Sequence, residues 1–285
     1  MVLESLFNPF SVKKKPWEMY FAGLMFSGIG FFVSYLVFRD IAGILAVFLT
    51  AIAALPIFYT TIKNEEELDL KLEDEWSLLK EHTKVVIFFI LFFLGVLTTF
   101  TATYLALPGD SVSDVFIFQE NAIKDIQVSV SDSNRITGGA SGSLYFKGIF
   151  FNNIKVLFFC IIFSFLYGTG AIFVLTWNAS VVAVAIGNLF KSKIAISAAA
   201  VGLPSIAGYF SVASFSVLRY MLHGILEMAA YMVAGLAGSI VSIALIKHNL
   251  KEHKVLVDAL DLLLISIGLL VVAGIVEVYI SPILI

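Results

Sequence analysis

Long apolar stretches constrain this chain more than any other feature of its sequence. Seven of them occur, at residues 17–38, 41–62, 84–107, 149–176, 194–217, 219–246 and 255–281. About 20 apolar residues in a helix are enough to cross the hydrocarbon core of a bilayer. The stretches therefore predict an all-α polytopic membrane protein with about seven transmembrane helices, within a range of six to eight.

The composition supports this class and excludes others. Of the 285 residues, 60% are hydrophobic and only 14% are charged, and the mean hydropathy is +0.98. Soluble domains carry about 25% charged residues. The net charge of −3 gives no sign of a nucleic-acid partner, so we expect the lipid bilayer as the main environment. The single cysteine, Cys160, excludes an intramolecular disulfide.

The distribution of basic residues predicts the orientation. With the N-terminus inside, 12 of the 18 Lys and Arg residues fall on the inner side and 6 on the outer side. By the positive-inside rule, this favours a multi-pass plasma-membrane protein with a cytoplasmic N-terminus and an extracytoplasmic C-terminus. The count treats the apolar segment 178–190 as too short to span. If it does cross, the later spans invert.

The spans and the polar segments divide the chain into five parts. They are an N-terminal pair of spans at 1–62, a cytosolic acidic helix at 63–84, a third span at 85–107, an extracytoplasmic loop of about 40 residues at 108–148, and a C-terminal membrane bundle at 149–285.

Segment 63–84 has the pattern of an amphipathic helix. Its apolar stripe is Leu68, Leu72, Trp76 and Leu79, and it carries eight acidic residues against four lysines. Anionic lipid headgroups would repel such a helix. It is therefore either a solvated linker or a surface that packs on cytoplasmic helix ends or on a protein partner.

The loop 108–148 is too apolar for a free tail, because it contains Phe116, Ile117, Phe118 and Ile123. Residues 126–131 alternate with period two, which predicts a short strand or an extended stretch. We expect part of the loop to cap the outer membrane face and to offer a surface to partners. The Gly/Ser-rich residues 138–143 are typical of a mobile linker.

A group of polar residues inside apolar stretches is the candidate site. His223 and Glu227 are four residues apart and share one face of a helix, and ionisable groups at membrane depth cost several kcal/mol unless they are paired or hydrated. In the predicted topology they share the outer half of the membrane with Asn152, Asn153, Lys155, Arg219 and Glu277. Two interpretations stay open: a structural network that cross-links helices, or an outward-facing cavity that holds an ion or ligand.

Small residues mark a second pattern. Ala230, Ala234, Gly238 and Ser242 recur every four residues, and Gly168 and Gly170 lie in the fourth stretch. Such ridges let helices approach closely, either within one chain or across a homodimer. The segment Gly202-Leu-Pro204 can break the fifth stretch into two pieces.

No catalytic motif stands out. His223 and Glu227 supply two metal ligands where catalytic zinc sites usually have three, so we expect no metal and no cofactor. Asp258 and Asp261 lie three apart on one helix, whereas an aspartyl intramembrane protease needs two facing aspartates. Enzymatic activity is left open, with none favoured.

Two motifs resemble the stage II sporulation protein M family of integral membrane proteins. One runs from Phe150-Phe-Asn152-Asn153 through Gly168-Thr-Gly170 to Trp177-Asn178-Ala-Ser, and the other is His223-Gly-Ile-Leu-Glu227 with Ala234, Gly235, Ala237 and Gly238 behind it. The similarity covers roughly residues 145–250. It implies Asn152, Asn153, His223 and Glu227 as motif positions, and a membrane scaffold that localises cell-wall-degrading partners.

Together the residues and the resemblance predict a multi-pass membrane scaffold or assembly protein. It would recruit partners through 108–148 or 63–84, and a homodimer is one arrangement that the small-residue ridge allows. The alternative is an ion- or proton-coupled transporter or channel-like protein that uses Glu227 and His223. An intramembrane hydrolase is a third and weaker possibility.

Overall fold

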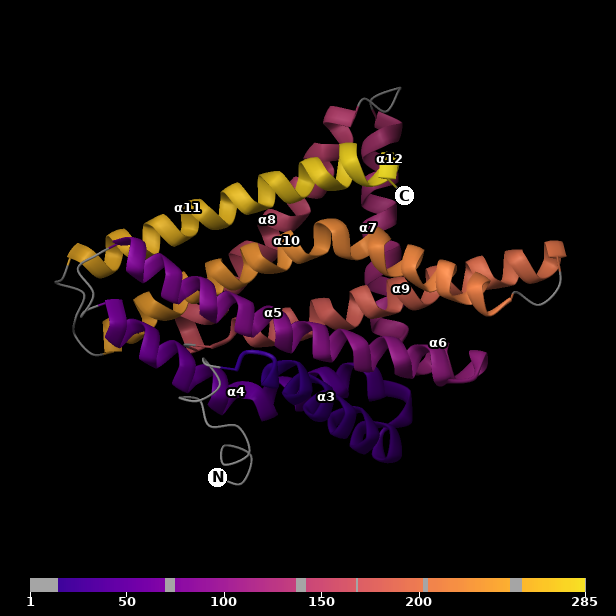
Figure 1. Ribbon diagram of the computed structural model, residues 1–285, viewed down its shortest axis with the longest axis horizontal. Helices are drawn as coiled ribbons and strands as arrows, with labels where there is room; N and C mark the ends of the chain where they lie inside the picture. Colours follow the sequence, from indigo (N-terminus) through magenta and orange to yellow (C-terminus); the bar gives the residue numbers. More distant parts are fainter. Residues whose placement is uncertain are drawn as a thin grey trace.

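The computed structural model describes residues 15–69, 75–136, 142–167, 169–201, 205–246 and 253–284. Throughout these ranges the regular structure is helical (Figure 1), and it contains no strand. The elements are α3 (Glu18–Val37), η1 (Arg39–Ile41), α4 (Ala42–Asp69), α5 (Glu75–Ala106), α6 (Gly109–Val115), α7 (Ile117–Ile136), α8 (Gly142–Tyr167), α9 (Ala171–Val201), α10 (Ile206–Ile246), α11 (His253–Ile275), η3 (Val276–Ile280) and α12 (Ser281–Leu284).

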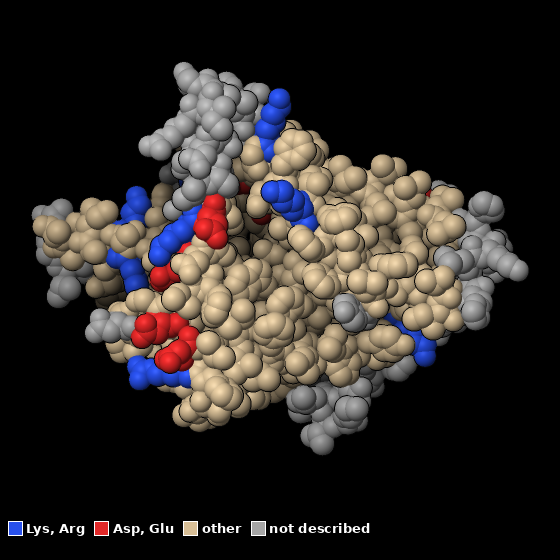
Figure 2. Space-filling view, turned by 180° about the vertical axis from the view of Figure 1, so that it is seen from behind, with Lys and Arg blue, Asp and Glu red and all other residues tan. Residues whose placement is uncertain are grey.

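Seven of these helical segments are long and apolar enough to cross a membrane. They are Glu18–Val37, Arg39–Asn64, Ser77–Ala106, Phe146–Leu166, Ala171–Ala199, Ile206–Ile246 and Val255–Ile283. The predicted all-α polytopic class is confirmed. In Figure 2 most of the visible charged residues lie toward one end, basic side chains also appear near the other end and at the upper edge, and uncharged residues cover the broad area between the two ends. A lipid-facing surface has this character.

The fourth to sixth spans differ from those expected. Segment 178–190 is not too short to span, because it forms the middle of α9. The predicted span 194–217 instead covers the end of α9 and the start of α10. Polar residues inside α9 hid this helix, yet their side chains bond to the helix's own backbone: Asn178 Nδ2 donates to the Val174 carbonyl oxygen at 2.9 Å and Ser180 Oγ to that of Trp177 at 2.7 Å. Gly202-Leu-Pro204 lies outside the described residues.

Close helix contacts hold the bundle together. Helix α3 packs on α4 and α5, α5 packs on α9, and α10 packs on α8, α9 and α11. Between α3 and α5, Gly23 and Gly95 face each other: a Cβ added at Gly95 would lie 2.1 Å from the Tyr20 carbonyl oxygen. Phenylalanine rings fill the adjoining core, and the rings of Phe58 and Phe89 stack with centroids 4.4 Å apart.

One end of the bundle is called the α7 end. Helices α5, α9 and α11 finish there, and α4, α8 and α10 begin there. Helix α7 runs across the other helices there (Figure 1) and contacts α4, α8 and α9. The expected strand at 126–131 is wrong, because these residues belong to α7. Phe116, between α6 and α7, is fully buried. Residues 138–141 lie outside the described residues.

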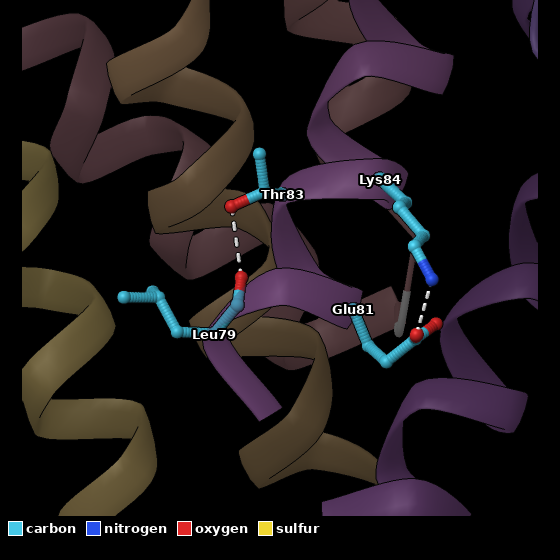
Figure 3. A network of polar contacts seen from close by, with 4 residues as sticks. All are labelled: Leu79, Glu81, Thr83 and Lys84. Carbon is cyan, nitrogen blue, oxygen red and sulfur yellow. Dashed lines mark hydrogen bonds and ion pairs between the residues drawn. The ribbon is translucent and has the colours of Figure 1, made fainter. Parts of the chain in front are cut away.

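The opposite end of the bundle carries the acidic segment. The residues expected to form one separate helix at 63–84 are divided between the end of α4 and the start of α5, and 70–74 lie outside the described residues. Local contacts stabilise the start of α5 (Figure 3): Thr83 Oγ1 donates to the Leu79 carbonyl oxygen at 2.8 Å, and Lys84 pairs with Glu81 one turn earlier.

Helices α9 and α10 project beyond their neighbours at the α7 end. In Figure 1 their joined ends extend farther along the long axis than α3, α5 or α6. Helix α10 has 41 residues. At about 1.5 Å per residue it is about 62 Å long, roughly twice the hydrocarbon thickness of a bilayer. Part of α10 therefore lies outside the hydrocarbon core unless the helix is steeply tilted.

Candidate functional site

A polar cluster joins α8, α10 and η3 at the α7 end. Asn153 of α8 donates its side-chain amide to Oε1 of Glu227 on α10. One turn earlier on α10, His223 Nε2 lies 4.0 Å from Oε1 of Glu277 on η3. Because His223 and Glu227 are four residues apart, one face of α10 holds both contacts. The cluster thus links three helical elements that are distant in sequence.

The cluster is largely withdrawn from the surface. Asn153 is 7% exposed, and the side chains of His223 and Glu277 are 13% and 25% exposed. His223 Nδ1 is buried, and no group in the described part of the chain forms a hydrogen bond with it. Ionisable groups in such surroundings are tolerated when they are paired, so the contacts stabilise one arrangement of α8, α10 and η3.

A wide helical turn carries Glu277. Residues Val276–Ile280 form a π-helix between α11 and α12. A π turn inserts one extra residue into an α-helix and is found frequently at functional sites. The extra residue sets which side chain near the end of α11 meets α10. The sequence gives no signal for this turn, because Glu277-Val-Tyr279 reads as an ordinary apolar helix end.

Two further residues of α10 belong to the cluster. Arg219 is half-buried one turn before His223 and interacts electrostatically with His223 and Glu277. Tyr231 is 1% exposed one turn after Glu227, and it lies close enough to Glu227 and Glu277 to interact with both. Sequence reasoning missed Tyr231, although the four-residue repeat from His223 through Glu227 leads directly to it.

The other predicted members are placed differently. Asn152 is half-buried next to Asn153, and Lys155 is exposed on α8. Neither forms a polar contact with the cluster within the described ranges. Neighbouring residues of a helix point about 100° apart, so the paired asparagines of α8 face different directions, and Asn153 is the one that faces Glu227.

The small-residue ridge of α10 is buried within the chain. Ala230, Ala234, Gly238 and Ser242 are all buried, and a Cβ at Gly238 would lie 2.8 Å from the Ile161 carbonyl oxygen of α8. Gly170 is equally tight, because its Cβ would lie 2.2 Å from the Phe163 carbonyl oxygen. Gly168 lies outside the described residues. This ridge packs α10 on α8, so it is not exposed to a second copy.

A second polar group, missed from the sequence, ties α7 to the bundle. The Tyr104 hydroxyl lies 2.8 Å from Asn188 Oδ1 and 3.2 Å from Glu120 Oε1, which brings α5, α9 and α7 together. Lys191 Nζ donates to the Tyr104 carbonyl oxygen at 2.9 Å and lies 4.7 Å from the centre of its ring. Gln119 adds a hydrogen bond of 3.3 Å from its amide to Ser180 Oγ.

The opposite end of the bundle has ionisable side chains of its own. A cavity of 320 Å³ between α5 and α11 is lined by His82, Asp258 and Asp261 together with leucine and isoleucine side chains. Within the described residues, no three His, Cys, Asp or Glu side chains are arranged to hold a metal ion.

Chemically, the cluster can hold or exchange a proton and can fix helices. An imidazole and a carboxyl group 4.0 Å apart can share a proton through a small adjustment, while the Asn153 amide fixes the second carboxyl group. No serine, cysteine or threonine side chain accompanies them in a contact that would activate a nucleophile within the described part of the chain.

Comparison with known proteins gives one match. The family described as Stage II sporulation protein M matches residues 84–282, which is more of the chain than the two motifs alone cover. The matched region includes Asn153, His223, Glu227 and Glu277, so the whole polar cluster lies inside it. No curated protein and no solved structure matches. The chain belongs to the stage II sporulation protein M family of membrane proteins.

Proposed function

We propose that this protein is a membrane scaffold that assembles partner proteins at the α7 end. The main support for this proposal is the projecting hairpin formed by the end of α9 and the start of α10. Residues 194–218 contain no charged side chain. Several large apolar side chains on the hairpin are exposed, including Ile196 at 67%, Ile206 at 84% and Phe210 at 74%. An exposed apolar surface of this kind is typical of a site at which another protein binds.

Charged residues elsewhere in the bundle indicate where the bilayer ends. Helix α4 has no charged residue from 42 to 62. Arg39 of η1 precedes this stretch, and Lys63 follows it. These 21 residues span about 32 Å, which matches a hydrocarbon core. Lys191 contacts the last turns of α5, and Lys193 lies 4.7 Å from the centre of the Phe215 ring. The hairpin beyond Lys193 therefore extends past the end of α5.

The polar cluster supports a scaffold by fixing the base of this hairpin. Arg219 and His223 lie on α10 directly after the uncharged residues. Through Glu227 and Glu277 the same helix is tied to α8 and η3. Helix α7, with Ile117 and Phe118 exposed, contacts α9 at the same end. The partner surface would consist of the hairpin and the first turn of α7.

We place the protein in the plasma membrane with a cytoplasmic N-terminus, so that the hairpin is extracytoplasmic. With the spans as folded, Lys191 and Lys193 move to the outer side, and 10 of the 18 basic residues stay inside. The excess is smaller than the sequence alone suggested but keeps its sign. A Ser113→Cys variant of a Cys160→Ala protein checks the orientation, because Ser113 is exposed on α6. An impermeant thiol reagent added outside intact cells should label it, and labelling only after lysis would reverse the orientation.

Photocrosslinking in living cells tests the scaffold. A photoreactive residue at Phe210 should give a discrete protein adduct, and Ile206→Lys should abolish it. The matched control is Phe32 of α3, which is 63% exposed and faces outward from the bundle within the span. An adduct of equal yield from Phe32, or none from Phe210, contradicts the proposal.

One observation favours transport as a second candidate. Ionisable groups lie at both ends of the seventh span, with Asp258 in the cavity of 320 Å³ and Glu277 in the polar cluster. Asp258 and Glu277 are 19 positions apart, which corresponds to about 28 Å along a helix. Buried apolar side chains, including Leu262, Leu270 and Ala273, occupy the stretch between these two groups, so transport would require the helices to move apart there. Proteoliposomes with a trapped pH dye test this directly, since a transporter would dissipate an imposed proton or cation gradient and Glu227→Gln would change the rate.

A further inference from the structure

A lateral groove lies in the half of the bundle away from the α7 end. It has a volume of 810 Å³ and runs between α4 on one side and the junction of α8 and α9 on the other. Its walls include Phe48, Ile52, Tyr59 and Thr60 of α4, with Phe163 of α8 and Phe173 of α9 facing them. None of these residues belongs to the polar cluster or to the projecting hairpin.

The two ends of the groove differ in character. At the deep end, the rings of Phe48 and Phe173 meet with centroids 4.6 Å apart, which closes the groove near the middle of the span. At the other end, the walls become polar at Tyr59 and Thr60. Lys63 is exposed one turn beyond Tyr59 on the same side of α4. The groove therefore leads from an apolar closed end to a basic group at the membrane surface.

The groove has the dimensions of a small-ligand site. From Phe48 to Thr60 it follows about 18 Å of α4. Its volume of 810 Å³ lies within the roughly 300–1,000 Å³ of such sites. The walls are also rigid on the α9 side, where Gly170 packs directly against the Phe163 backbone.

The charges select the headgroup. Lys63 can contact a phosphate, but Glu65, Glu66 and Glu67 follow it two to four positions later in the chain, after Asn64. Residues 63–67 therefore carry a net charge of −2 in the sequence, which disfavours a lipid with net negative charge and suits a headgroup with both a phosphate and an ammonium group. We propose that the groove binds one zwitterionic phospholipid, with an acyl chain between α4 and the α8–α9 junction and its phosphate at Lys63.

Native mass spectrometry of the full chain in detergent tests this binding. Phosphatidylethanolamine and phosphatidylglycerol with the same acyl chains are added separately. Ile52→Trp fills the groove from a wall position that is 60% exposed, so the change does not disturb the core. Ile29→Trp, at a position of α3 that is 55% exposed, is the matched control. Lys63→Gln, compared with Lys155→Gln, tests the phosphate contact.

We expect one phosphatidylethanolamine retained per 31.2 kDa chain. Retention should fall about tenfold in Ile52→Trp and Lys63→Gln, which corresponds to about 1.4 kcal/mol, and should be unchanged in the two controls. Equal retention of phosphatidylglycerol overturns the charge argument and the proposal with it. A lipid that remains bound to Ile52→Trp also overturns it, as does a dimer of the wild-type chain that Ile52→Trp converts to a lipid-free monomer.

Discussion

Gly23 of α3 and Gly95 of α5 lie backbone against backbone, because neither residue has a side chain to hold the helices apart. A Cβ at Gly23 would lie 2.4 Å from the Phe92 carbonyl oxygen, and one at Gly95 would lie 2.9 Å from the Leu24 amide nitrogen. Atoms of the backbone cannot turn aside as a side chain can. The contact therefore fixes the separation of the first and third spans.

Gly95→Ala should destabilise the protein by about 1–3 kcal/mol, as expected for an overpacked core. Gly28→Ala is the control, because a Cβ there meets no atom within 4 Å. That variant should be neutral or slightly more stable, since alanine favours the helix. The free energy of unfolding in mixed detergent micelles measures both. Equal stability of the two variants would mean that α3 and α5 can separate without cost.

Asn153→Ala should destabilise the protein by about 1–3 kcal/mol, because it leaves the Glu227 carboxyl group buried without its donor. Asn152→Ala is the control at the neighbouring, half-buried position. Glu227→Gln should cost less than Asn153→Ala, since a carboxamide oxygen still accepts the Asn153 hydrogen bond. The same unfolding measurement ranks the three, and a larger loss in Asn152→Ala would show that the cluster is centred on the wrong asparagine.

Tyr104→Phe should loosen α7 without unfolding the bundle. It removes a hydroxyl group that contacts Glu120 of α7 and Asn188 of α9, each contact being worth about 0.5–1.5 kcal/mol. Hydrogen exchange should therefore become faster in residues 117–126 than in the spans. Tyr279→Phe, at a position that is 48% exposed and outside the groove, serves as the control. Uniform acceleration along the chain would instead mean that the hydroxyl group stabilises the whole bundle.

Two substitutions of similar size at Gln119 should differ strongly in their effect on stability. The Gln119 side chain is fully buried, and its Oε1 has no hydrogen-bond partner in the described part of the chain. Gln119→Met removes this unsatisfied oxygen together with the 3.3 Å hydrogen bond to Ser180. The two effects oppose each other, so stability should change by less than about 1 kcal/mol. Gln119→Glu buries a charge beside Ser180 and should destabilise the protein by several kcal/mol. Thermal unfolding at neutral pH compares them, and a stable Gln119→Glu protein would show that water reaches this position.

The sequence was sufficient for the fold class, and it drew attention to His223 and Glu227. Runs of apolar residues report burial in lipid directly, and His223 with Glu227 is conspicuous because ionisable groups are costly there. The boundaries of the middle spans were less visible. No charged residue marks the end of α8 at Tyr167 or the start of α9 at Ala171, so hydropathy alone merges the start of α9 with α8.

The partners of the cluster depend on features that no local pattern records. Whether Asn152 or Asn153 faces Glu227 is decided by the rotation of α8, which its apolar residues leave undetermined because they lie on all sides. The contacts of Tyr104 with Asn188 and Glu120 join residues 84 and 16 positions apart. Such pairings follow from tertiary packing. The alternation at 126–131 was misleading because these six residues lie within the 20-residue helix α7, whose context outweighs a short period-two pattern.

The π-helix at Val276–Ile280 separates the rotational phase of the chain's last residues from that of α11. Each residue of an α-helix turns the next by about 100°, so one inserted position redirects every side chain that follows it. Deleting a single residue from this turn would let α11 continue as a regular helix through Ser281, which is buried. The length of this short segment, more than the identity of its residues, therefore sets which side chains at the end of the seventh span can reach His223.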